Sequence, residues 1–275
     1  MNKYPLAKKS LGQNFLINET VVKNICKNAI INDRVILEVG AGTGCLTREI
    51  IKNNPKYLII IEKDSRMINI LNKLCEKLNF KDKTMIINDD ALHFSLGEIL
   101  QMYQDNNKDN YHNLTKKLTI ISNLPYNIGT TLVMNWIEQT DEIEEIVVML
   151  QKEVVDRFCA KQSTKDYGKI SVLTQSVCNT KKLFDVSQKC FIPMPKVISS
   201  VIKITPKENK ISKEEYQKLN SFCKVAFSQR RKKLIKILKN SKEYKHIIPD
   251  NNIITDNNRA DEISIENYLK LIKYL

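Results

Sequence analysis

The sequence lacks the features of metal-binding, disulfide-linked and membrane proteins. Its seven cysteines form no C-x-x-C pair and it has only three histidines, so we expect no metal site. An odd number of scattered cysteines is typical of reduced thiols in a reducing compartment. No stretch approaches the roughly 18 consecutive apolar residues of a membrane helix, and no signal-peptide-like apolar run follows the first lysines. We therefore expect a cytoplasmic protein that makes no membrane contact.

The charge of the chain is strongly basic, and its distribution is more informative than its total. There are 44 basic and 31 acidic residues, a net charge of +13, which favours a polyanionic partner. Because 37 of the basic residues are lysine, a codon bias could produce the same total. However, residues 206–275 hold 16 basic and 9 acidic residues, and 224–245 hold nine basic and one acidic. This concentration favours a C-terminal region that binds nucleic acid.

Alternating strand and helix patterns predict an α/β fold. Repeated alternation of this kind is typical of a mostly parallel sheet with helices on both faces, with ligands bound beyond the carboxyl ends of the strands. Short apolar runs predict seven strands, over 34–39, 57–61, 84–87, 118–121, 143–150, 183–186 and 199–204. Helices are expected over 43–52, 66–78, 128–138 and 151–160.

Two regions depart from this alternation. Residues 101–117 are polar, rich in asparagine and without periodicity, so we expect a mobile surface loop there. After residue 206 the strand patterns end, and 213–228, 230–239 and 265–275 have helical patterns. We therefore predict a catalytic domain over 1–205 and a small, all-helical, basic domain over 206–275.

A glycine loop follows the first strand, in the sequence EVGAGTG. Gly40 and Gly42 would let the backbone approach a ligand closely, and Glu62, at the end of the next strand, could accept hydrogen bonds from both ribose hydroxyls of a nucleoside. The G-x-G-x-G spacing differs from the dinucleotide pattern G-x-G-x-x-G, but alone it does not separate NAD from S-adenosylmethionine, nor exclude a plain tight turn. Asp90, after the third strand, could bind a cofactor adenine or cap a helix.

The sequence NLPY, at 123–126, lies at the end of the fourth predicted strand. The Asn123 side-chain oxygen and the Leu124 carbonyl could each accept one N–H of an aromatic amine, which would aim the nitrogen lone pair at a methyl donor. Pro125 stiffens the loop and has no N–H to compete. Tyr126 offers a ring face on which a flipped base can stack. An isolated Asn-Pro turn is the alternative, and the position of NLPY behind a glycine cofactor loop makes it the weaker interpretation.

Ordered motifs along nearly the whole chain resemble the ribosomal RNA adenine dimethyltransferases. The bacterial members of this family dimethylate two neighbouring adenines near the 3′ end of small-subunit ribosomal RNA. The motifs are LGQNFL at 11–16, EVGAGTG at 38–44, IEKD at 61–64, DDAL at 89–92, NLPY at 123–126, MLQKE at 149–153, FIPMPKV at 191–197 and AFSQRRK at 226–232. The resemblance implies a Rossmann-like fold with a seven-stranded sheet, S-adenosylmethionine as methyl donor and no metal.

The resemblance also implies roles for individual residues. Asn14, Leu16, Gly40, Gly42, Glu62, Asp90 and Asn123 would bind the cofactor. Asn123, Leu124, Tyr126 and Phe191 would hold the target adenine, with Phe191 as the second wall of an aromatic sandwich. Lys8, Lys9, Arg230, Arg231, Lys232 and Lys233 would contact RNA phosphates, although a solvated helix face is the alternative for residues 230–233.

Three other functions remain open from the sequence. The nearest is a relative that methylates large-subunit ribosomal RNA and confers antibiotic resistance. The second is an RNA-binding assembly factor in which catalysis is secondary, and the third, disfavoured by the glycine spacing, is an NAD-dependent dehydrogenase. Our preferred prediction is direct methyl transfer to small-subunit ribosomal RNA within a pre-assembled small subunit, carried out by a monomer.

Overall fold

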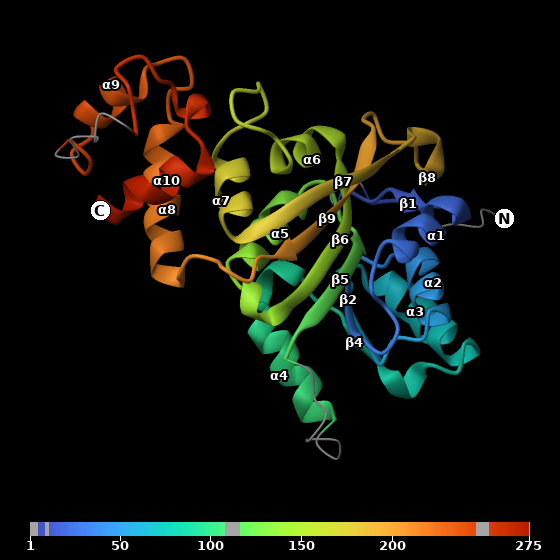
Figure 1. Cartoon of the computed structure of the whole chain (residues 1–275). Helices are drawn as coiled ribbons and strands as arrows, with labels where there is room; N and C mark the ends of the chain where they lie inside the picture. Colours follow the sequence, from blue (N-terminus) through green and yellow to red (C-terminus); the bar gives the residue numbers. More distant parts are fainter. Residues whose placement is uncertain (1–4, 9–10, 108–115, 246–252, 275) are drawn as a thin grey trace. The chain divides into compact units, whose positions relative to one another are not determined.

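The computed structural model describes residues 5–8, 11–107, 116–245 and 253–274 (Figure 1). The chain divides into two compact units. The first comprises Met1–Val155 with Lys181–Pro206, and the second comprises Asp156–Thr180 with Lys207–Leu275. The sequence predicted a single division at residue 206. The structure has a division at that point, but it also places Asp156–Thr180 in the second unit.

A seven-stranded sheet forms the centre of the fold, as the sequence predicted. Its strand order is β4-β3-β2-β5-β6-β9-β7; the first five of these run parallel, and β9 is antiparallel to β6. Because β2 pairs with β3 on one side and β5 on the other, the strand order reverses there, which is where such folds bind ligands. The strands are β2 (Val35–Val39), β3 (Tyr57–Ile61), β4 (Thr84–Ile87), β5 (Leu118–Asn123), β6 (Ile143–Gln151), β7 (Cys178–Val186) and β9 (Ser199–Pro206).

Helices cover both faces of the sheet. In Figure 1, α1, α2 and α3 lie on one side of the strands, and α4 and α5 lie on the other. Apolar side chains of α1, α2 and α3 join strand residues in one hydrophobic core, which fixes the loops at the carboxyl ends of the strands. The helices are α1 (Glu19–Lys27), α2 (Cys45–Lys52), α3 (Ser65–Lys77), α4 (Leu96–Asn106), α5 (Gly129–Ile137) and α6 (Lys152–Phe158).

The prediction of a loop over 101–117 is wrong in its first part. Helix α4 continues to Asn106, and its buried residues Leu96, Ile99, Leu100 and Tyr103 have the i, i+3, i+4, i+7 spacing of one helix face. A capping box between Ser95 and Glu98 fixes its start. The polar residues that conceal this pattern lie on the solvent face. Residues 108–115 of the predicted loop lie outside the described part of the chain.

The second unit is helical in its described part, apart from the first residues of β7. Helix α7 (Lys169–Val177) contacts α8 (Lys213–Ala226) and α10 (Ile265–Leu271). Aromatic rings centred on Phe222 and Tyr268, 6.0 Å apart, form its core. Helix α9 spans Leu234–Lys239, so the predicted helix over 230–239 starts too early; residues 230–233 form a turn and an isolated bridge to Arg259. Within the described ranges, no helix is long and apolar enough to cross a membrane.

Candidate active site

The glycine loop after β2 lies between two other loops of the first unit. Gly40 and Gly42 have φ values of 72° and 57°, in the left-handed region that favours glycine. A Cβ on Gly40 would lie 3.2 Å from Pro125, and a Cβ on Gly42 would lie 3.1 Å from Phe15. Both glycines are therefore required by backbone conformation and by close packing, which explains their spacing in the sequence.

Glu62 connects the glycine loop to the end of β3. Its Oε2 accepts the Gly42 N–H at 2.8 Å, and its Oε1 accepts the Asp64 N–H at 2.8 Å. The residue is only 5% exposed, and burial raises the pKa of its carboxyl. Each carboxylate oxygen has a second lone pair, so both can still accept a ligand hydroxyl. This geometry fits the predicted contact with a ribose.

Asp90 caps the short helical turn after β4. Its Oδ1 accepts the Leu92 N–H at 3.0 Å, and its Oδ2 forms an ion pair of 2.7 Å with Lys63. This ion pair is the first cause of a lowered pKa for Asp90, so the carboxylate is ionised. The capping role left open by the sequence is therefore present, and Asp90 also lines the cavity described below. Its contact with a cofactor adenine stays a prediction.

The NLPY loop begins where β5 ends. The Asn123 Nδ2 donates to the Asn14 carbonyl at 3.3 Å, and Oδ1 is the acceptor of this side chain. Pro125 has no N–H, and its carbonyl accepts the N–H of Gly129 at 2.9 Å at the start of α5. The Tyr126 hydroxyl forms a 2.6 Å hydrogen bond with Ser199 on β9, and burial raises its pKa, so it stays a neutral phenol. The orientation of Asn123 is therefore suited to accepting an amine N–H.

The N-terminal segment, of which residues 5–8 and 11–17 are described, lies against these loops. Strand β1 (Phe15–Leu16) pairs antiparallel with β8 (Phe191–Ile192), and the Ile17 N–H donates to the Cys190 carbonyl at 2.9 Å. Phe191 is 3% exposed and packs in the hydrophobic core. In this arrangement Phe191 pairs with Leu16 through the backbone and supports the N-terminal segment. The stacking of its ring on a target base stays a prediction.

One cavity brings most of the predicted site residues together. The loops after β2, β3, β4 and β5 line it, together with the N-terminal segment. Of the predicted cofactor and catalytic residues, those on its wall are Asn14, Leu16, Gly40, Gly42, Glu62, Asp90, Asn123, Leu124 and Tyr126, whereas Phe191 is not among them. The loop of Gly40 and Gly42 has no room for further side chains and lies beside the buried carboxylate of Glu62. This arrangement fits a nucleoside cofactor such as S-adenosylmethionine. In the described part of the chain, no three His, Cys, Asp or Glu side chains gather in a way that could hold a metal ion.

Glu38 is a cavity residue to which the sequence analysis gave no role. It is the penultimate residue of β2, just before Val39 and the glycine loop, and its Oε2 accepts the Thr47 hydroxyl at 2.7 Å. The pKa of Glu38 is raised to about 8, chiefly by burial and in smaller part by the nearby charge of Glu62. Its position just before the glycine loop was the available signal, and the burial that sets its pKa follows only from the fold.

The raised pKa of Glu38 predicts a pH dependence of stability. In the unfolded chain this carboxyl releases its proton near pH 4.5, whereas in the folded protein it keeps the proton to about pH 8. Since the folded state binds more protons between these values, stability should fall as the pH rises through them. We expect Glu38→Gln to remove about 1–3 kcal/mol of that loss, because glutamine stays neutral and still accepts from Thr47.

Urea unfolding at about pH 5 and about pH 8 would measure this effect. Glu138→Gln, at an exposed residue after α5, is the matched control and should follow the wild type. Equal pH slopes for the wild type and Glu38→Gln would contradict the assignment.

The predicted RNA-binding residues have different surroundings. Lys8 forms an ion pair with Asp64, and Lys9 lies outside the described residues. The Arg230 guanidinium donates to the carbonyls of Lys165 and Tyr167, so it holds the second unit together. Lys233 donates to Asn257 at 2.6 Å. Arg231 and Lys232 are exposed side chains of the same turn.

The fold and the cavity define a Rossmann-like methyltransferase that uses S-adenosylmethionine. A family model described as ribosomal RNA adenine dimethylase matches residues 5–275. The ribosomal RNA small subunit methyltransferase A of Wolbachia sp. subsp. Drosophila simulans (strain wRi) is 35% identical to this chain, over 98% of this chain and 94% of that protein. The protein of the same name from Pelagibacter ubique (strain HTCC1062) is also 35% identical, over 97% and 96%.

Solved structures agree in fold. A dimethyladenosine transferase from Plasmodium falciparum superposes with a TM-score of 0.75 at 23% identity, over 94% of this chain and 95% of that chain. The 23S rRNA methyltransferase ErmE superposes with a TM-score of 0.67 at 20% identity, over 95% and 99%. The chain belongs to the ribosomal RNA adenine dimethylase family. It is an enzyme that transfers methyl groups from S-adenosylmethionine to adenine.

Proposed function

We propose that the enzyme dimethylates N6 of two adjacent adenines near the 3′ end of small-subunit ribosomal RNA. The relatives of 35% identity that span almost the whole chain are named for the small subunit, which supports this choice over large-subunit RNA. The observation that carries the chemistry is the position of Asn123 on the wall of the same cavity as Glu62 and the glycine loop, with its Nδ2 donating to the Asn14 carbonyl and its Oδ1 available as an acceptor. We further propose that a monomer acts in the cytoplasm on a partly assembled small subunit.

The cavity residues would act mainly by positioning. Asn123 Oδ1 and the Leu124 carbonyl accept the two N–H groups of the target amine, which directs the nitrogen lone pair along the line of transfer. S-adenosylmethionine supplies an electrophilic methyl group on its sulfonium. The ring of Tyr126 stacks on the base and favours the positive charge that develops on nitrogen. No side chain has to act as a strong base, because the N–H becomes acidic once the nitrogen is alkylated and its proton passes to water.

Methyl transfer to defined ribosomal particles tests this proposal. The substrates are small subunits, deproteinised small-subunit RNA and large subunits, all from a host that lacks the enzyme. We expect labelled methyl groups in small subunits, and less label in the free RNA because assembled RNA presents the site in a fixed shape. Label in large subunits alone would contradict the substrate assignment. Label in free RNA but not in subunits would contradict the proposed assembly stage.

The basic turn of the second unit, residues 230–233, is expected to contact RNA phosphates. Arg231→Ala combined with Lys232→Ala should weaken binding and reduce the slope of log affinity against log salt by about one unit per lost phosphate contact. Arg230→Ala should instead destabilise the second unit by about 1–3 kcal/mol, because two backbone carbonyls lose their donor. Titrations at several salt concentrations and unfolding curves measure the two effects.

The matched control is Lys270→Ala, an exposed residue of α10 that pairs with Glu266 at 2.9 Å. It removes one positive charge from the same unit outside the turn. If it changes the salt slope, per charge removed, as much as the double variant Arg231→Ala, Lys232→Ala does, the turn has no special role in binding RNA.

A further inference from the structure

Asp64 is a buried charge at the turn between β3 and α3, next to the cofactor cavity. Its side chain is 0% exposed, and its backbone N–H donates to Glu62 at 2.8 Å. It is the N-cap of α3, since its Oδ1 accepts the Arg66 N–H at 3.3 Å. The Arg66 guanidinium beside it, together with further hydrogen bonds, holds the pKa of Asp64 far below its usual range. The carboxylate is therefore a permanent, desolvated negative charge.

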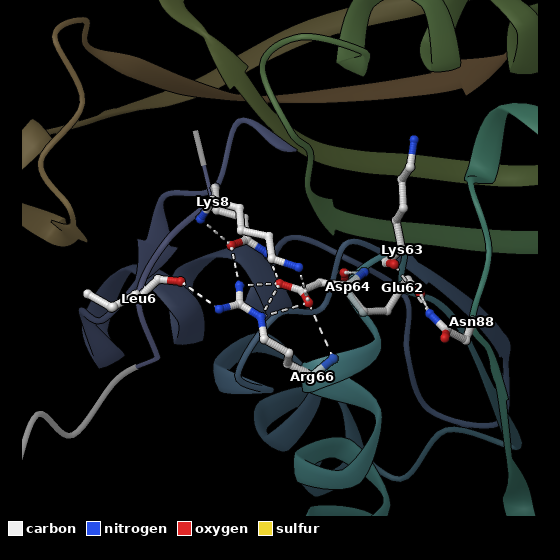
Figure 2. A network of polar contacts seen from close by, with 8 residues as sticks. Leu6, Lys8, Glu62, Lys63, Asp64, Arg66 and Asn88 are labelled. Carbon is white, nitrogen blue, oxygen red and sulfur yellow. Dashed lines mark hydrogen bonds and ion pairs between the residues drawn. The ribbon is translucent and has the colours of Figure 1, made fainter. Parts of the chain in front are cut away.

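Side chains from the N-terminal segment surround this carboxylate. Gln13 Nε2 donates to its Oδ2 at 2.8 Å, and Lys8 Nζ lies 3.4 Å from its Oδ1. Arg66 binds both carboxylate oxygens and donates through its other nitrogen to the Leu6 carbonyl at 3.1 Å. Figure 2 shows Lys8 and Arg66 converging on Asp64, while Lys63 points away from the cluster. A helix cap alone would need none of these contacts across more than 50 residues of sequence.

The segment held in this way forms one wall of the cofactor cavity. Residues 11–16 line it, and the Gln13 side chain also accepts the Lys8 N–H at 2.8 Å, which folds the segment on itself. Beyond Gln13, the Asn14 carbonyl accepts from Asn123 and β1 pairs with β8. Residues 11–16 are thus held at one end by Asp64 and at the other by Asn123 of the NLPY loop. Loss of the Asp64 end would leave the wall held from one side only.

We propose that Asp64 is a positioning residue that holds the N-terminal segment closed over the S-adenosylmethionine site. Asp64 acts through Gln13, Lys8 and Arg66, and it needs no contact with the cofactor itself. Closing this wall excludes water and keeps Asn14 in place, so the contribution of Asp64 should appear in cofactor binding more than in the transfer step. The inference rests on the proposed function only in that the cavity takes this cofactor.

Asp64→Asn separates this role from helix capping. Asparagine caps helices about as well as aspartate, but it is uncharged, and its NH₂ would face donors. We expect the Kd and KM for S-adenosylmethionine to rise about tenfold, with kcat at saturating cofactor nearly unchanged. Trypsin cleavage in the N-terminal segment should become faster and should slow again when cofactor is added. Gln13→Ala should reproduce these changes without altering the cap, and the double variant should be less than additive.

Glu76→Gln is the matched control, since it breaks an exposed ion pair with Lys81 at the end of α3 opposite to Asp64 and should change neither KM nor cleavage. An unchanged KM and cleavage rate in both Asp64→Asn and Gln13→Ala would overturn the proposal and leave Asp64 as a helix cap. A lower unfolding temperature in Asp64→Asn with unchanged KM would overturn it as well. Cofactor affinity is measured without RNA, so failure to methylate small subunits would refute the proposed function and leave this comparison intact.

Discussion

Replacing Asn123 with alanine is expected to lower kcat by about 10²- to 10³-fold, the size of effect seen when one preorganised hydrogen-bonding group is removed from a reaction centre. The variant loses the Oδ1 acceptor that would orient the target amine, and also the Nδ2 donor that holds the Asn14 carbonyl at 3.3 Å. The second loss should weaken cofactor binding only modestly, since Glu62 and the glycine loop remain. Single-turnover transfer and cofactor titration, measured side by side, separate the two contributions.

Asn135→Ala is the matched control for this experiment. Asn135 is an exposed residue on α5, the helix that follows the NLPY loop, and its side chain lies on the solvent face. It should keep the wild-type rate. A decrease of less than about fivefold for Asn123→Ala would be far below the effect of losing a positioned catalytic group, and would remove Asn123 from that role.

Glu62→Gln is expected to raise the Kd for S-adenosylmethionine by about 10- to 100-fold, the range of a lost charge-assisted hydrogen bond. One carboxylate oxygen would become an NH₂ group, which would face the N–H of Gly42 or of Asp64 instead of accepting from it. The loop would therefore be displaced and one ribose contact would be lost. With saturating cofactor, kcat should recover most of its value, because the catalytic loop after β5 is unchanged.

Calorimetric titration of the cofactor measures this change directly. Glu138→Gln carries the same substitution at an exposed position and should bind cofactor as the wild type does. An unchanged Kd for S-adenosylmethionine in Glu62→Gln would mean that Glu62 only holds the glycine loop through Gly42 and does not contact the cofactor.

Most strands of the central sheet were predictable because they are continuous apolar runs. Strand β7, CNTKKLFDV, is largely polar, and only its residues 183–186 were predicted. Tyr57–Ile61 has the bounds expected from its sequence, since a strand buried on both faces has no polar positions to interrupt the pattern. The edge strand Thr84–Ile87, which is only partly buried, also has the expected bounds. Helix α7 was not predicted. Its sequence, KISVLTQSV, is rich in β-branched residues with low helix propensity, and packing against α8 and α10 stabilises it instead.

Site residues were predictable only where they belong to a sequence motif. Gly40, Glu62 and Asn123 lie at the carboxyl ends of strands, so the α/β pattern alone brings them to one edge of the sheet. In contrast, the pairing of Asp64 with Gln13 joins positions 51 residues apart through side chains that are unremarkable in sequence. Arg230 likewise belonged to a basic run in the sequence, and only the fold shows that its guanidinium binds carbonyls of its own unit.

The most direct test of the proposed function is nucleoside mass analysis of small-subunit RNA after reaction with the wild-type enzyme. The RNA comes from subunits of a host that lacks the enzyme, and nuclease mapping follows to locate the modified positions. The proposed function predicts N6,N6-dimethyladenosine at two adjacent adenines near the 3′ end, formed about 10²- to 10³-fold more slowly in a parallel reaction with Asn123→Ala. Dimethyladenosine confined to large-subunit RNA, or no methylated adenine in either RNA although the cofactor binds, would contradict it.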